Sequence, residues 1–312
     1  MSPAKPQATQ RNASPNRKDP PEVVDPIWLI KALSLSLAGA LVCGYAALCF
    51  LYYQGAWQLL LHPSHVVDRT PARFNISFAD VHFDSAETGQ PRLTGWWIPA
   101  ESLNGTPARY AAFTVLYLHD GSGSLSGTVT TLTELHRAGL NIFAIDYRGF
   151  GASDSSVHPS EQRMSQDAAA AFDYLTATRH IPAENIIPYG TGLGSSLAAN
   201  LAANNRGVQA VILDNPDADP AAVAAAQTSR LIPARMLIGR PFDIAKSVST
   251  LTIPKLLIDG GPNSPSNRDD RRLEELFKRA SSPSFKVTLP TDSGESYQIW
   301  LERFLDQYLS AK

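Results

Sequence analysis

No residue between Ala32 and Tyr53 is charged, and this stretch of 22 residues restricts the fold of the chain more than any other feature. About 20 apolar residues cross the hydrocarbon layer of a bilayer, where only a helix satisfies its own backbone hydrogen bonds. Aromatic residues suited to the two membrane interfaces flank the stretch, with Trp28 at one end and Tyr52 at the other. We therefore predict a transmembrane helix over residues 27–53.

Residues 1–26 are rich in Pro, Ser, Asn and charge, so we expect them to form a disordered cytoplasmic tail. The basic residues that precede the span are Lys5, Arg11, Arg17, Lys18 and Lys31. The positive-inside rule then places the N-terminus in the cytoplasm and the domain formed by residues 54–312 outside it. A cleavable signal peptide is the alternative, but its apolar region would be shorter and a small-residue cleavage site would follow it. We find no such site.

Composition excludes several classes of function for the part that follows the span. Both cysteines, Cys43 and Cys49, lie inside the apolar stretch, so residues 54–312 have no disulfide and no thiol nucleophile. No His/Cys cluster with metal-ligand spacing is present, and we expect neither a metal nor another cofactor. The net charge of −2 gives no argument for a nucleic-acid partner.

Short apolar runs alternate with helical patterns along residues 54–312. Expected strands are 92–99, 113–120, the start of 141–151, 208–215, 254–260 and 285–290; expected helices are 128–139, 160–180, 267–280 and 296–309. Gly139 and Ser160 suit the end of one helix and the start of the next. Such an order predicts an α/β fold with a mostly parallel central sheet and helices on both faces. The Ala-rich stretch 216–250 could form a small cap over the sheet.

The stretch "NIIPYGTGLGSSLAANLA", residues 185–202, predicts a buried strand, a glycine-rich turn and a small-residue helix. With "GWWIPA", "VLYLHDGSGS", "DYRGFGASD" and "PSEQRMSQDAAAAFDYLTA", it resembles the α/β-hydrolase fold, in particular its membrane-anchored, single-span branch of serine hydrolases. The resemblance covers residues 56–310. It implies that Gly190 and Gly194 flank the sharp turn that carries the catalytic serine. Gly192 stands where that serine would be, and without a side-chain oxygen it cannot form an acyl-enzyme.

The other two members of the catalytic triad are also replaced, by the same resemblance. The position of the family's acid corresponds to about Asn263, and the position of its histidine base corresponds to Glu295, just before the last helix. The histidines are His62, His65, His82, His119, His136, His158 and His180, so none follows residue 180. No shift of the alignment can therefore supply a C-terminal base.

The resemblance also assigns the backbone donors of the oxyanion hole to Gly121 and Leu193. Asp120 stands where the family usually has glycine, and a carboxylate beside this hole would oppose a developing oxyanion. We therefore expect a degenerate site, in a protein that has lost serine-hydrolase activity and binds a small acyl or anionic ligand or a protein partner.

Three alternatives stay open. The first is an active esterase or acyl hydrolase with a rearranged site, in which Ser195 or Ser196 reacts, or Glu295 and Asp120 form a carboxylate pair. In the second, the turn from Gly190 to Gly194 binds a dinucleotide, with Ser195 as the third small residue of the fingerprint and Asp214 as the ribose-binding acid. In the third, Ser195 and Ser196 have no chemical role and only cap the following helix, and Glu295 is a solvated loop residue.

Overall fold

The uncharged stretch near the N-terminus forms a single long helix, α1 (Pro26–Gly55), none of whose residues is buried. The apolar segment Pro26–Leu59 has a mean hydropathy of 1.9 and is long enough to cross a membrane. The computed structural model describes residues 25–85, 91–101, 106–260, 270–290 and 294–309. The chain divides into two compact units, Met1–Phe50 and Leu51–Lys312, and the second carries all elements described below.

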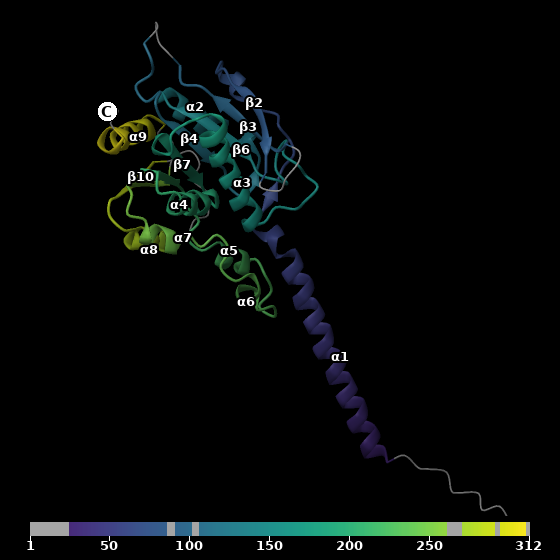
Figure 1. The fold of residues 1–312 in the computed structure, drawn as a ribbon. Helices are drawn as coiled ribbons and strands as arrows, with labels where there is room; N and C mark the ends of the chain where they lie inside the picture. Colours follow the sequence, from purple (N-terminus) through teal and green to yellow (C-terminus); the bar gives the residue numbers. More distant parts are fainter. Residues whose placement is uncertain (1–24, 86–90, 102–105, 261–269, 291–293, 310–312) are drawn as a thin grey trace, which may run out of the picture. The chain divides into compact units, whose positions relative to one another are not determined.

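An eight-stranded sheet forms the centre of the larger unit, with the strand order β10-β9-β8-β7-β4-β6-β3-β2 (Figure 1). Its strands are β2 (Ala79–Asp84), β3 (Pro91–Ile98), β4 (Thr114–Leu118), β6 (Asn141–Asp146), β7 (Ile186–Thr191), β8 (Val211–Asp214), β9 (Lys255–Gly260) and β10 (Ser284–Leu289). The pairs β2–β3 and β3–β6 are antiparallel and all others are parallel. The predicted fold class is confirmed.

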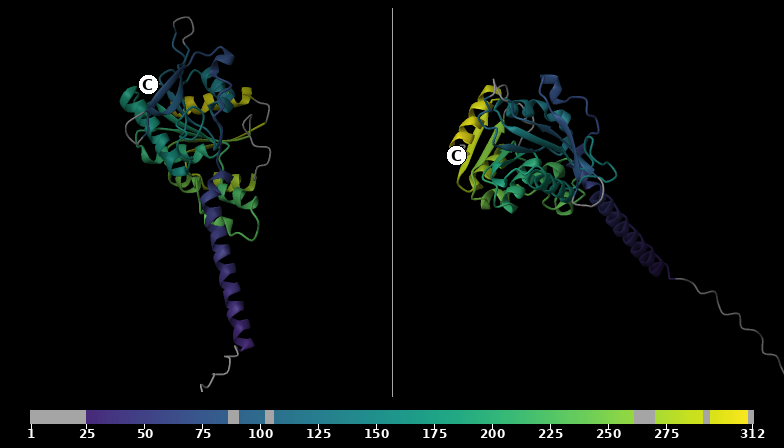
Figure 2. Two further views of the ribbon diagram at one scale, coloured as in Figure 1. Left: turned by 90° about the vertical axis from the view of Figure 1, so that its right-hand side faces the viewer. Right: turned by 45° about the horizontal axis from the view of Figure 1, so that its top comes forward.

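Helices cover both faces of this sheet. They are α2 (Val129–Arg137), α3 (Glu161–Asp173), α4 (Gly194–Asn204), α7 (Ile244–Thr250), α8 (Asp270–Arg279) and α9 (Gly294–Tyr308). Two further views show α9 and β10 at the edge of the domain opposite β2 (Figure 2). A small second sheet pairs β1 (His62–Pro63) with β5 (Ser122–Gly123), and short 3-10 turns occupy Ala56–Leu59, Pro71–Phe74, Leu125–Thr128 and Ala183–Asn185.

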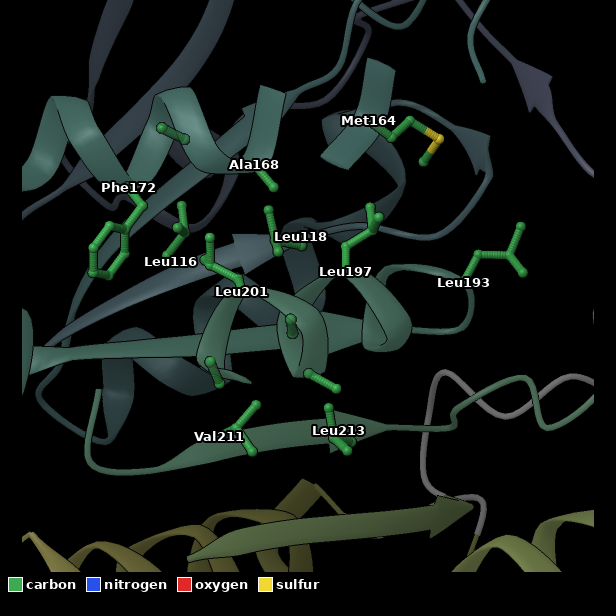
Figure 3. Close-up of a cluster of buried hydrophobic side chains, with 14 of the residues drawn as sticks. Leu116, Leu118, Met164, Ala168, Phe172, Leu193, Leu197, Leu201, Val211 and Leu213 are labelled. Atoms are coloured by element: carbon green, nitrogen blue, oxygen red, sulfur yellow. The ribbon is translucent and has the colours of Figure 1, made fainter. Parts of the chain in front are cut away.

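The side chains of β4 alternate between two apolar clusters, one on each face of the sheet. Leu116 and Leu118 pack with residues of α3 and α4, among them Phe172 and Leu197 (Figure 3). Val115 and Tyr117 belong to the cluster formed with α2 and α9. All five residues of β4 are buried, and four of them are apolar, as expected for a central strand that helices cover on both faces.

Helix ends follow the expected signals. Ser160 accepts a hydrogen bond from the backbone N–H of Arg163 and so caps α3. Gly139, with φ of +86°, follows α2. The predicted helix 160–180 ends as an α-helix at Asp173, and one π-helical turn, Tyr174–Thr178, continues it.

One strand of the larger unit, β2, was not predicted from the sequence, because only Val81 and Phe83 of its six residues are buried at this edge of the sheet. The stretch 216–250 forms three short helices, namely α5 (Pro220–Ala226), α6 (Ala234–Ile238) and α7.

Candidate functional site

The turn between β7 and α4 has the sharp geometry that the glycines of its sequence indicate. Gly192 lies at its tip with φ of +54°, and its N–H donates to the carbonyl of Asp214 over 3.1 Å. A Cβ at Gly190 would lie 2.5 Å from the Cα of Ser195, and one at Gly194 would lie 2.5 Å from the carbonyl oxygen of His119. Close packing of the helix on the sheet therefore requires glycine at both flanking positions.

The two expected oxyanion donors lie together, and one side chain of the protein accepts from both. Asp120 Oδ1 accepts hydrogen bonds from the N–H of Gly121 over 2.6 Å and of Leu193 over 2.9 Å. We expected this carboxylate beside the predicted oxyanion hole; in the structure its Oδ1 accepts from both of the expected donors. Hydrogen bonds from backbone N–H groups to a carboxylate are charge-assisted and strong.

The same carboxylate fills the space next to the tip of the turn. A Cβ placed on Gly192 would lie 2.5 Å from Asp120 Cγ and would overlap Oδ1 more severely. Burial raises the pKa of Asp120, although its two backbone donors act in the opposite direction. A side chain at position 192 and the observed position of Asp120 therefore exclude each other.

A cleft of about 430 Å³ opens above the turn, at the carboxyl ends of β4, β7 and β8. Hydroxyl, amide and carboxylate groups line much of it. Its lining residues are Tyr117, Asp120, Ser122, Gly123, Ser124, Gly127, Thr128, Thr191, Gly192, Asn215 and Asp217. No sequence pattern singled out Asn215 or Asp217, although the rule that ligands bind beyond the carboxyl ends of parallel strands could have indicated them.

The expected acid and base positions add no observed side chain to this cleft. Asn263 lies outside the described residues. Glu295 is the second residue of α9, and its side chain is not among those that the structure describes. The proposed pair of Glu295 with Asp120 therefore stays a prediction.

His119 directly follows β4, and its ring makes structural contacts rather than catalytic ones. It is buried, its Nδ1 lies 2.6 Å from the carbonyl oxygen of Asp120, and its Nε2 lies 3.5 Å from Asp146 Oδ1. Burial lowers the pKa of His119 to about 4, so the ring is neutral at pH 7. Its carbonyl also accepts a hydrogen bond from the hydroxyl of Tyr147. These contacts are those of a structural histidine beneath Asp120.

Replacing Asp146 by asparagine is expected to make stability rise more steeply with pH between about 4 and 6. Burial raises the pKa of Asp146 to about 6. As pH rises from about 4 to 6, the folded state gains stability from His119, because the imidazole is protonated only in the unfolded chain. Over the same pH range the folded state loses stability from Asp146, because its carboxyl group is protonated only in the folded chain. Asparagine removes the second, opposing contribution.

Urea unfolding of the detergent-solubilised protein at pH 4.5 and 6.5 measures this effect. The gain in unfolding free energy between the two pH values should be larger in D146N than in the unsubstituted protein, by more than about 1 kcal/mol. Asp173→Asn, which replaces an exposed carboxylate of α3, is the control. Parallel profiles for D146N and the unsubstituted protein would contradict the assignment.

Ser195 and Ser196 are buried, and each hydroxyl donates to a backbone carbonyl of the turn. Ser195 Oγ donates to the carbonyl of Gly190 over 2.8 Å, and Ser196 Oγ donates to that of Leu193 over 2.9 Å. Neither lines the cleft. Neither serine caps α4, whose N-cap residue is Leu193 and has no side-chain cap, so the expected capping role is wrong. Both hydroxyls instead donate to carbonyls inside the turn, which does not suit a nucleophile.

Asp214 is buried at the end of β8, and both of its carboxylate oxygens accept hydrogen bonds within the domain. Oδ2 accepts from the hydroxyl of Tyr189 and Oδ1 from the side-chain amide of Asn215, each over 2.7 Å. The Tyr189 hydroxyl in turn accepts from that of Tyr297. This arrangement does not present the carboxylate to a ribose, and it weakens the dinucleotide alternative.

Comparison with known proteins gives one consistent result. The family described as serine aminopeptidase, S33, matches residues 111–275. An uncharacterized protein of Mycobacterium tuberculosis is 30% identical over 201 residues, which are 64% of this chain and 66% of that protein. The alpha/beta hydrolase domain-containing protein WAV2 of Arabidopsis thaliana is 29% identical over 192 residues, 61% of this chain and 59% of its own. The matched stretch thus spans less than two thirds of either relative.

Solved structures agree on the architecture. An esterase of Pyrococcus furiosus superposes with a TM-score of 0.60 at 18% identity, over 80% of this chain and 98% of that chain. At this identity the likeness concerns the fold alone.

Proposed function

This chain belongs to the serine aminopeptidase S33 family of the α/β-hydrolase superfamily, and we propose that it is a member that binds a ligand in the former active-site cleft without hydrolysing it. One observation carries this proposal: the carboxylate of Asp120 accepts the hydrogen bonds of both Gly121 and Leu193. The two N–H groups that would stabilise an oxyanion therefore already bind a carboxylate of the protein itself.

Serine hydrolysis needs an attacking oxygen, a base that takes its proton and donors that stabilise the developing oxyanion. The removal of a single oxyanion donor costs a serine protease about 10²–10³ in kcat. Here the attacking position is Gly192, and no histidine follows residue 180. By resemblance, Asn263 and Glu295 replace the acid and the base. Each loss supports the same proposal.

The lining of the cleft favours one kind of ligand. Its carboxylates, Asp120 and Asp217, and the hydroxyls of Ser122, Thr128 and Thr191 suit a small molecule with several hydroxyl groups or an amine. The sequence also allowed an anionic ligand, but this cleft suits an anion less well. Asp120 would have to be protonated or displaced before an anion could reach the backbone donors.

The proposal includes the membrane. Residues 27–53 anchor the protein as a single-pass helix, residues 1–26 form a cytoplasmic tail, and the domain of residues 54–312 lies on the opposite side. The length and apolar character of α1 support the anchor, and the basic residues that precede it support the orientation.

A fluorophosphonate probe is expected not to label the detergent-solubilised full chain, because no activated serine is available. An active serine esterase, treated in parallel, should be labelled stoichiometrically, and the heat-denatured chain gives the nonspecific background. Stoichiometric labelling of one serine, abolished by its substitution with alanine, would overturn the proposal in favour of an active hydrolase with a rearranged site. A second experiment compares the ligand classes. Thermal-shift titrations with a polyol, a primary amine, acetate and NAD measure which of them raises the unfolding temperature of the protein.

A further inference from the structure

Three large apolar side chains are exposed on the segment formed by α5, α6 and the residues around them, 220–240. The exposed fractions are 79% at Leu231, 78% at Met236 and 49% at Val223. Leu231 and Met236 are more exposed than any large apolar side chain of α1, where the highest value is 76%, at Leu35. Apolar side chains that are this exposed and close in sequence mark a contact surface.

The packing of this segment is the reverse of that of an ordinary surface helix, which turns its large apolar residues toward the core. Among the residues that α5 buries are Ala221 and Ala224, whereas Val223 is exposed. Helix α6 buries only Ala234. The segment therefore buries small residues, while three of its larger apolar residues, Val223, Leu231 and Met236, are exposed.

The same segment is basic. Residues 220–240 contain three arginines, Arg230, Arg235 and Arg240, and no acidic residue. All three arginines are exposed. Arg235 forms an ion pair with Asp219, just before the segment, over 2.8 Å. Exposed apolar side chains interleaved with arginines are typical of surfaces that lie in the headgroup region of a bilayer and bind anionic lipids.

A contact within the larger unit places this segment beside Tyr52, the last residue but one of the predicted span 27–53. The hydroxyl of Tyr52 lies 2.9 Å from Thr228 Oγ1. Tyr52 belongs to the unit Leu51–Lys312. It is also one of the aromatic residues expected at the membrane interface. Thr228 lies between Val223 and Leu231, so the exposed apolar residues are close to the expected membrane surface.

We propose that residues 220–240 dock on the surface of the bilayer that the chain's own apolar helix crosses. Val223, Leu231 and Met236 enter the boundary between headgroups and acyl chains, and the arginines bind the phosphates of anionic phospholipids. Docking would also restrain one wall of the cleft, because Asn215 and Asp217 lie within five residues of the start of α5 at Pro220. The inference rests on the proposed membrane anchor, so its test measures the anchor separately.

The test uses the full chain in nanodiscs, with Cys43→Ser and Cys49→Ser as background and one added cysteine that carries an environment-sensitive fluorophore. Leu231→Cys and Met236→Cys report on the docking surface. Ile299→Cys, an apolar position of α9 that is 50% exposed, is the matched control. Lipids with a nitroxide near the headgroup quench a fluorophore that touches the bilayer.

In discs that contain phosphatidylglycerol, we expect at least twofold quenching at positions 231 and 236, weaker quenching in discs of phosphatidylcholine alone, and none at position 299. Equal quenching at 231 and 299 would overturn the docking proposal. A change at 231 in lipid-free protein that depends on protein concentration would also overturn it, because a second copy would then cover the surface. A separate variant that keeps Cys43 and carries only Cys49→Ser, labelled at Cys43 in discs whose lipids carry a nitroxide on the acyl chain, tests the anchor. Quenching at Cys43 without quenching at 231 would leave the anchor standing and the docking surface refuted.

Discussion

Replacing Gly192 by serine is expected to destabilise the protein and to restore no hydrolysis. A side chain in the left-handed conformation costs roughly 1–2 kcal/mol, and forcing extra atoms into a packed site costs about 1–3 kcal/mol. Both effects apply, because Gly192 has φ of +54° and its Cβ would overlap the carboxylate of Asp120. Thermal unfolding in detergent should show a loss of about 2–5 kcal/mol, and the fluorophosphonate probe should still not react.

A double-mutant cycle identifies the physical cause of this loss. Asp120→Ala removes the atoms that the new side chain overlaps, so G192S should cost about 1–3 kcal/mol less in the D120A background. Gly127→Ser is the matched control, since Gly127 lines the same cleft but a Cβ there would have nothing within 4 Å. Equal costs for G192S and G127S would show that Asp120 does not fill this space. Turnover by G192S alone would show that a base and an acid had been overlooked.

Replacing Asp167 by alanine is expected to cause the largest loss of stability, about 3–5 kcal/mol, because it leaves a buried guanidinium without its carboxylate. Arg148 and Asp167 are both fully buried, and Arg148 Nε donates to Asp167 Oδ1 over 2.7 Å. The other carboxylate oxygen, Oδ2, accepts from the backbone N–H of Arg148 over 2.9 Å. This pair joins α3 to the turn that follows β6, and Tyr147 in that turn contacts the carbonyl of His119.

Arg137→Ala is the control for this prediction. Arg137 and Glu134 form an ion pair of the same length, 2.7 Å, but the arginine is 58% exposed. Such pairs contribute about 0–1 kcal/mol. A thermal unfolding experiment that gave similar losses for D167A and R137A would contradict the assigned role of the buried pair.

Local sequence patterns predicted most of the elements of the fold. The strands β3, β4, β6, β7, β8, β9 and β10 all lie within or next to their expected ranges. Residues that end or begin helices, such as Gly139 and Ser160, act through their own backbone neighbours, which is why they could be read from the sequence. Strand β2 escaped prediction because a half-exposed edge strand has too few apolar residues to form a pattern.

The candidate site was predicted in its backbone but not in its contacts. The sequence by itself determined that a glycine stands at the tip of the turn, that no histidine follows residue 180, and that an uncharged stretch of 22 residues precedes the domain, since these are properties of the chain's covalent order. Only the tertiary structure decided that Asp120 accepts both backbone donors. One of these donors is 73 residues away in the chain, and the direction of a carboxylate depends on side-chain rotation and on the groups that folding brings around it. Likewise, only packing decided that the segment 220–240 buries alanines such as Ala224 while it leaves Leu231 and Met236 exposed.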